Sequence, residues 1–168
     1  MDIKNKQELD ALFVKRDEGQ RVAAQAADAR RAKQQAFIDR FCKIRAEVVV
    51  PAMSEFGEYL KAQGLDFDVR SEDAGPAGQR RGAVNASISI AFAPRGKLNT
   101  IQRDHAELTL RCEESREQVL MHVSAMWPGC GGSSGPGGDI PLESVTAKFV
   151  EETLTALVKQ VLSGRAPR

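Results

Sequence analysis

The most constraining feature of this sequence is the stretch from Ala23 to Leu65, whose residues are typical of a long helix. From residue 37 onward, apolar residues recur every three or four positions, at Phe37, Phe41, Ile44, Val48, Ala52, Phe56 and Leu60. This spacing puts them on one side of a helix, as expected for a helix that lies on a sheet. Gly64 would end the helix, and Pro51, which follows three valines, predicts a kink or a break within it.

The first part of this stretch, residues 21–36, is rich in alanine and charged residues and has little to bury. A continuous helix over residues 23–64 would be roughly 60 Å long, whereas a strand of about eight residues covers only about 25 Å. One sheet therefore cannot cover the whole helix. We expect either that the helix folds back at Pro51 or that residues 21–36 form a helical arm that packs on a partner, in the simplest case in a homodimer.

Beyond Gly64 the apolar residues change from helical spacing to alternation, which is typical of strands with one buried face. Residues 66–71 and 86–93 alternate in this way, and Ile88, Ile90 and Phe92 share one face of the second segment. Residues 72–85 between them contain several glycines and are interpreted as a loop.

The strongest local pattern predicts a hairpin over residues 106–126, with its turn at Ser115 and Arg116. This register pairs apolar residues across the two strands: Leu108 with Val123, Leu110 with Met121, and Cys112 with Val119. All six then lie on one face, as a half-buried antiparallel ribbon requires. A shift of one residue would expose the whole set, so the register is well constrained.

A glycine-rich segment separates this hairpin from the last helix. Residues 129–138 contain six glycines and are interpreted as a flexible loop. The apolar residues that follow recur at helical spacing, at Val145, Phe149, Val150, Leu154, Leu157, Val158, Val161 and Leu162. Asp139 and Ser144 are candidates to cap this helix, and Gly164 would end it.

Together these elements predict an α+β fold of two layers. A long N-terminal helix, kinked at Pro51, and a C-terminal helix pack on the same face of a four-stranded antiparallel sheet, whose other face is polar. We expect a single domain over residues 21–163, including the N-terminal helical arm. Residues 1–20 would be a mixed-charge segment, either a short helix or partly disordered, and residues 164–168 a frayed tail.

Composition narrows the class of protein. The net charge is +1, so no global field steers the chain to nucleic acid or to a membrane. The three cysteines are an odd number at wide spacings, which favours reduced thiols over a disulfide framework. The first residues lack a signal-peptide pattern, and no apolar run reaches the roughly 18 residues that a membrane span needs. We therefore expect a soluble, cytoplasmic protein without a membrane partner.

The polar face of the predicted hairpin is the first candidate site. Thr109, Arg111 and His122 would lie near one another on this face, and Leu120 would be exposed beside them. Such a surface could bind a protein, a peptide or a small anionic ligand. It could also be only the solvent side of the sheet.

The glycine-rich segment is the second candidate. A glycine-rich turn before a helix can present backbone N–H groups to an anion, and Gly131, Gly132, Ser133 and Ser134 would do so here. The residue spacing of known phosphate-binding loops is absent. A flexible connector is the simpler interpretation.

Basic residues form a third candidate, a set of nucleic-acid contacts. They lie on the long helix and in the loop that follows residue 72, at Arg30, Arg31, Lys33, Arg40, Arg80 and Arg81. Aromatic residues do not interleave with them for base stacking, so a solvated helix face is the simpler interpretation.

The sequence predicts no catalytic set, no metal site and no cofactor. Neither C-x-x-C nor H-x-x-x-H occurs, and in the predicted register Cys112 and His122 point to opposite faces. We expect a small, non-catalytic binding protein that forms a homodimer through its helical arm and binds a macromolecular partner, in the first place another protein. The alternatives are a nucleic-acid-associated protein that uses the basic residues, and a small enzyme with a site between the sheet face and the glycine-rich segment.

Overall fold

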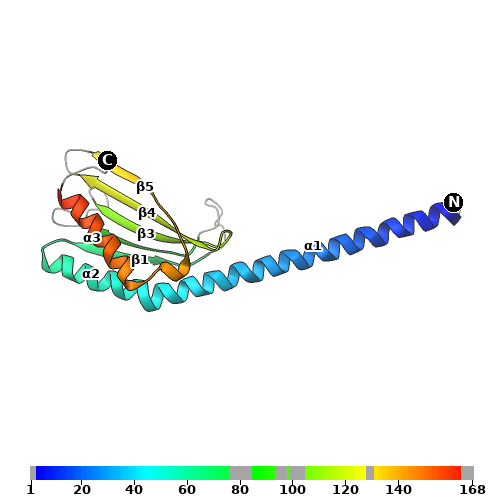
Figure 1. The fold of residues 1–168 in the computed structure, drawn as a ribbon, viewed down its shortest axis with the longest axis horizontal. Coiled ribbons are helices and arrows are strands. Elements are labelled where there is room, and N and C mark those ends of the chain that lie inside the picture. The colour runs from blue at the N-terminus through cyan, green and yellow to red at the C-terminus, as the bar shows by residue number, and fades with distance from the viewer. Residues whose placement is uncertain (1–2, 76–84, 94–97, 99–104, 128–130, 164–168) are drawn as a thin grey trace. The chain divides into compact units, whose positions relative to one another are not determined.

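The computed structural model describes residues 3–75, 85–93, 98, 105–127 and 131–163. The chain divides into two compact units, Met1–Ala36 and Phe37–Arg168. Its elements, labelled in Figure 1, are α1 (Ile3–Ile44), a π-helical turn (Arg45–Val49), α2 (Val50–Ala62), β1 (Phe67–Glu72), β2 (Ser87–Phe92), β3 (Ala106–Glu113), β4 (Gln118–Trp127), β5 (Gly131–Ile140), a 3-10 turn (Leu142–Ser144) and α3 (Ala147–Ser163).

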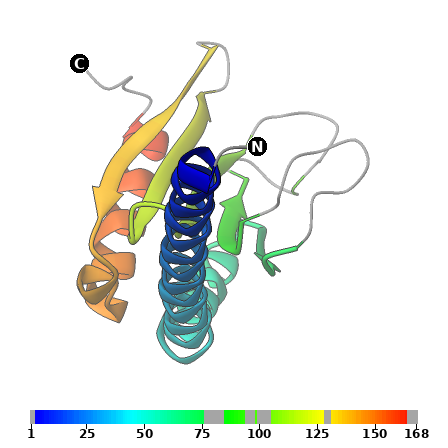
Figure 2. The same cartoon turned by 90° about the vertical axis from the view of Figure 1, so that its right-hand side faces the viewer.

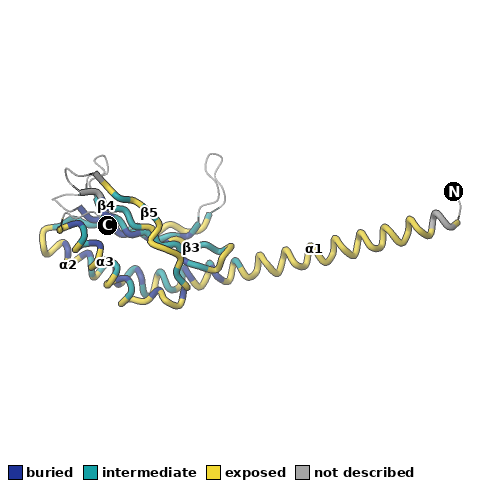
Figure 3. The backbone as a smooth tube through the Cα atoms, turned by 45° about the horizontal axis from the view of Figure 1, so that its top comes forward, coloured by how far each residue is buried: buried dark blue, intermediate teal, exposed yellow. Residues whose placement is uncertain are grey.

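The first unit is a stretch of helix, the part of α1 that precedes residue 37. The helix begins at Ile3, so the helical arm comprises residues 3–36 and includes residues 3–20 of the mixed-charge segment, which was predicted to be a short helix or partly disordered. A glycine within a helix costs about 1 kcal/mol, which the good helix formers around Gly19 offset. The described residues up to Lys33 are exposed (Figure 3). The arm therefore buries little within its own unit.

The helix changes character just before Pro51. Residues 45–49 form a π-helical turn, in which the N–H of Val50 donates to the carbonyl of Arg45. Pro51 then lies in the first turn of α2, where a missing N–H costs least. The predicted disturbance at Pro51 is thus a widened turn that lies before the proline, and the ribbon changes direction there (Figure 1).

The second unit has two layers, and the predicted α+β fold is confirmed. All strand pairs are antiparallel, and the strands lie in the order β1-β2-β3-β4-β5. Helix α2 packs on β1 and β2, α3 packs on β3 and β4, and the two helices contact each other on the same sheet face (Figures 1 and 2).

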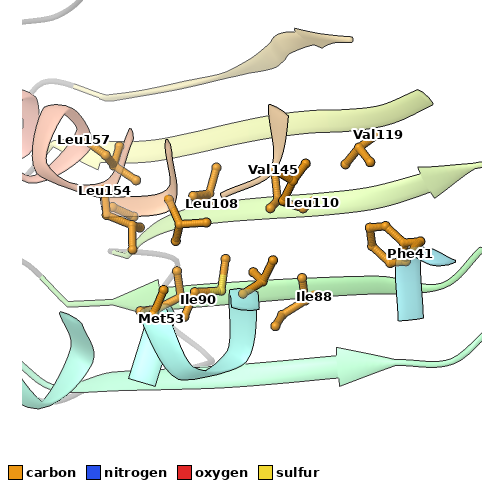
Figure 4. Packing of buried hydrophobic residues seen from close by; sticks show 14 of the residues in the cluster. Phe41, Met53, Ile88, Ile90, Leu108, Leu110, Val119, Val145, Leu154 and Leu157 are labelled. Atoms are coloured by element: carbon orange, nitrogen blue, oxygen red, sulfur yellow. The ribbon is translucent and has the colours of Figure 1, made fainter. Parts of the chain in front are cut away.

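The predicted hairpin register is confirmed in full. Leu108 pairs with Val123, Leu110 with Met121 and Cys112 with Val119. The turn occupies residues 114–117, with Glu117 in the left-handed region at φ 53°. Side chains from this face of the sheet meet those of the helices in one core (Figure 4), which includes Phe41, Met53, Ile88, Ile90, Leu108, Leu110, Val119, Val145, Leu154 and Leu157.

The prediction of a flexible loop over residues 129–138 is wrong for the part that the structure describes. Residues 131–140 form β5, which pairs with β4 along its length, and the sheet therefore has five strands instead of four. Glycine has a low strand propensity, which is why the composition indicated a loop. Here the small residues allow close approach, because a Cβ at Gly137 would be 2.6 Å from Met121 Cε. The register shifts between Met121 and His122, near Gly138, whose φ is 113°.

The start of α3 also differs from the prediction. Neither Asp139 nor Ser144 caps it: the N–H of Phe149 donates to Thr146 Oγ1 at 3.2 Å, so Thr146 is the cap. Asp139 instead accepts a 3.5 Å hydrogen bond from Arg116. Asp139, Ser144 and Thr146 lie within eight positions of one another, and sequence order alone does not show which of them caps the helix.

Arg45 joins the helical layer to the edge of the sheet. Its guanidinium donates to the carbonyls of Glu72 at 2.6 Å and Ser87 at 3.2 Å, and it also pairs with Asp73. The side chain is only 11% exposed. Arg45 therefore holds the end of β1 and the start of β2 against the π-helical turn.

Candidate binding site on the open sheet face

The residues predicted for the first candidate site lie together on the open face. Thr109 pairs with His122 and Arg111 pairs with Leu120 across β3 and β4. These four side chains line a depression of about 260 Å³. They meet there because alternate residues of a strand point to opposite faces, so the residues between the buried positions of β3 and β4 all face outward.

Polar residues from the two neighbouring strands complete this surface, which we call the open-face site. On one side, Ser87 pairs with Arg111 and Ser89 with Thr109. On the other side, Ser134 Oγ of β5 lies 3.1 Å from Nε2 of His122. The first and second candidate sites, predicted separately, thus meet at the contact between His122 and Ser134.

Arg111 gives the open-face site its charge. The side chain is exposed, and in the part of the chain that the structure describes it has no ion-pair partner. A guanidinium offers five N–H donors in a fixed plane and binds carboxylate or phosphate oxygens with two parallel hydrogen bonds. Thr109 and His122 add further polar groups, and Leu120 adds an apolar contact. This arrangement suits an anionic group attached to an apolar one.

The contact between Ser134 and His122 resembles only part of a nucleophilic site. Such a site needs a base that is itself held by a third group, and donors for the developing oxyanion. Among the described residues, no carboxylate bonds to His122, and the nearby Asp139 is bound to Arg116. Both side chains are also exposed to water. Among the described residues, the contact is a single hydrogen-bonded pair of a hydroxyl and an imidazole.

The glycine-rich residues do not take the positions that the anion-binding hypothesis assumed. Gly131, Gly132, Ser133 and Ser134 pair with β4 from Trp127 to Ser124. Their backbone groups run along an edge strand and do not converge on the start of α3. Anion binding by these four residues stays a prediction.

The basic residues predicted for nucleic acid are divided between the two units, and two of the six lie outside the described residues. Arg30, Arg31 and Lys33 are exposed on the arm. Arg40 belongs to the second unit and lies 2.5 Å from Glu143. The pKa of Glu143 is lowered, first by its own backbone N–H and then by Arg40. Arg80 and Arg81 lie outside the described residues.

The structure also presents a groove that the sequence did not indicate. It measures about 300 Å³ and lies between the second and third α-helices, where it is lined by Ala52, Glu55, Phe56, Tyr59, Glu151 and Thr155. In the sequence, Glu55 and Tyr59 are four residues apart, and so are Glu151 and Thr155. Residues at this spacing share one face of a helix, and this is the only signal that could have suggested a surface formed by the two helices.

The described residues form neither a metal-binding cluster nor a membrane-spanning helix. Within the described ranges, no three side chains of the types His, Cys, Asp and Glu lie close enough to hold a metal ion. The thiol of Cys112 is buried and that of Cys42 partly buried, while Cys130 lies outside the described residues. None of the helices that the structure describes is long and apolar enough to cross a bilayer. No family model, curated protein or solved structure matches this chain.

Proposed function

We propose that this chain is a cytoplasmic, non-catalytic binding protein that self-associates through its helical arm and binds a protein partner on the open-face site. The observation that carries the proposal is the exposure of the arm. Six large apolar side chains of the arm are exposed by 42–75%: Ile3, Leu9, Leu12, Phe13, Val14 and Val22. Exposed apolar clusters of this kind mark surfaces that contact another molecule.

Three of these residues form a cluster on one side of the helix. Leu9, Leu12 and Phe13 are spaced as i, i+3 and i+4, so their side chains are neighbours. They are exposed by 42–63%, so burying the rest of each side chain would contribute about 1–1.5 kcal/mol. A long exposed helix gains most of its stability from packing of this kind, because isolated helices are marginal in water. Contact between two arms would provide it.

Sedimentation velocity of two triple variants tests this proposal. Leu9→Ser, Leu12→Ser and Phe13→Ser together remove the apolar cluster, whereas Ile3→Ser, Val14→Ser and Val22→Ser remove as many exposed apolar residues from other sides of the helix. We expect the first variant to dissociate at concentrations where the second and the native chain stay associated. Equal behaviour of both variants would count against the cluster.

The open-face site supports the second half of the proposal. Arg111 has no ion-pair partner among the described residues and lies beside the apolar Leu120, which fits an acidic segment of a protein. Pull-downs from native lysate can use the native chain, Arg111→Ala and Arg116→Ala as baits. Arg116→Ala is the control, because it removes an exposed arginine from the nearby turn. We expect partners that bind the native chain and Arg116→Ala but not Arg111→Ala. Identical recovery on all three would argue against the site.

The nucleic-acid alternative is less well supported. Arg40, one of the residues predicted for nucleic acid, pairs with Glu143 within the second unit. A gel shift at low salt would detect binding by the exposed arginines of the arm.

A further inference from the structure

The groove between α2 and α3 combines an apolar floor with acidic walls. Ala52 is 5% exposed and Phe56 is partly buried, so the floor belongs to the edge of the core. Tyr59 is 63% exposed, although its ring is the kind of group that proteins normally pack. Glu55 and Glu151 line the groove from the two helices.

The carboxylates of Glu55 and Glu151 make no ion pair and accept no side-chain hydrogen bond from any residue that the structure describes. By contrast, Glu152, one residue further along α3, pairs with Lys148 at 3.8 Å. Two unpaired carboxylates beside two aromatic rings favour a cationic occupant, which both the charge and the ring faces attract.

The occupant must also be narrow enough for a groove between two helices. A helix with small residues and cations on one side meets both requirements, in the way that amphipathic helices lie in apolar grooves. The arm has such a side, because Ala23, Ala26, Arg30 and Lys33 recur at i, i+3, i+7 and i+10. Neither Arg30 nor Lys33 has an ion-pair partner among the described residues.

We propose that the groove between α2 and α3 binds the alanine-rich, basic segment 23–33 from the helical arm of a second copy of this chain. Alanines would contact Ala52 and Phe56, and Arg30 and Lys33 would meet Glu55 and Glu151. The proposal rests on self-association through the arm and names the surface that receives it. If each copy gives its arm to the other, two such contacts close a dimer.

Charge reversal in full-length chains tests this docking. One variant carries Glu55→Arg and Glu151→Arg, and the other carries Arg30→Glu and Lys33→Glu. A control with Glu47→Arg and Glu152→Arg has the same net charge as the groove variant but changes exposed carboxylates that do not line the groove. Association constants are measured by sedimentation for each protein alone and for mixtures.

We expect each reversal alone to weaken self-association by about tenfold or more, and the control to stay within about twofold of the native chain. A mixture of the two reversal variants should associate more tightly than either alone, because the exchanged charges again complement each other.

Unchanged self-association of the groove variant would overturn the docking proposal and indicate that the groove has another occupant or none. The apolar variant at Leu9, Leu12 and Phe13 then separates the two hypotheses. If that variant dissociates while the groove variant does not, association through the arm stands without the groove. A native chain that is monomeric would overturn both.

Discussion

Gly57 of α2 lies directly against the ring of Phe67 in β1. A Cβ atom at residue 57 would be 2.2 Å from Cδ2 and Cε2 of that ring, much closer than van der Waals contact. Glycine usually destabilises the interior of a helix. Here its lack of a side chain allows α2 to approach the edge of the sheet, which closes the core at β1.

Gly57→Ala should therefore destabilise the second unit despite the better helix propensity of alanine. We expect a loss of about 1–3 kcal/mol in the free energy of unfolding, because the ring of Phe67 must move. Gly19→Ala is a matched control, since it is also a helical glycine but has nothing within 4 Å, and it should raise helix stability by up to about 1 kcal/mol. Urea unfolding followed by circular dichroism measures both. Equal effects of the two substitutions would contradict the packing account.

A second pair of glycines tests the packing of β5 on β4. A Cβ at Gly137 would lie 2.6 Å from Met121 Cε and 3.1 Å from its Cγ, whereas Gly135 has nothing within 4 Å. We expect Gly137→Ala to cost up to about 1 kcal/mol, because the flexible side chain of Met121 must shift, and Gly135→Ala to be neutral or slightly stabilising. If residues 131–140 were a loose loop, both substitutions would be tolerated alike in a urea titration.

The difference between β4 and β5 explains how far the sequence could predict this fold. The partners of Leu108 and Leu110 follow from alternation within the hairpin, so the register could be read from the residues themselves. The role of Gly137 depends on Met121 of the neighbouring strand, which no local pattern encodes. The composition of the segment therefore indicated a loop where tertiary packing makes a strand.

The candidate sites show the same limit. Thr109 and His122 could be placed together because they belong to one hairpin of known register. The contact of His122 with Ser134 could not, because it depends on a strand whose composition predicts a loop. Glu55 and Glu151 come from two helices far apart in sequence, and only the packing of α2 on α3 brings them to one groove.

Replacement of Arg45 should show how much its contact between the helical layer and the sheet contributes to the free energy of unfolding. Arg45→Met keeps the length of the side chain but leaves the carbonyls of Glu72 and Ser87 without this donor. We expect a loss of about 1–3 kcal/mol in unfolding free energy. Arg70→Met is the control, because it removes only an exposed ion pair with Asp68. It should change the unfolding free energy by less than about 1 kcal/mol. Similar losses in both would show that Arg45 is only a surface residue.

Cys112 should make stability depend on pH in the alkaline range. Burial, and then the negative charge of Glu114, raises the pKa of its thiol from 9.0 to about 12. Between these values the unfolded chain has lost the proton and the folded chain has kept it, so stability falls as pH rises, by up to about 1.4 kcal/mol per pH unit. Below pH 9 this contribution is constant.

Unfolding curves between pH 8 and about pH 11 for native chain, Cys112→Ala and Val119→Ala measure this effect. Val119→Ala alters the cross-strand partner of Cys112 without removing the thiol. Both variants should be less stable than the native chain, but only Cys112→Ala should lose part of the alkaline slope. Three parallel curves would contradict the burial of this thiol.

Light scattering of the chain at micromolar concentration tests self-association through the helical arm most directly. The molar mass that it measures shows how many copies of the chain are associated in solution. The chain has a mass of 18.3 kDa. We expect a scattering mass of about twice that value, falling on dilution as the dimer dissociates. A mass of one chain at every concentration measured would contradict it.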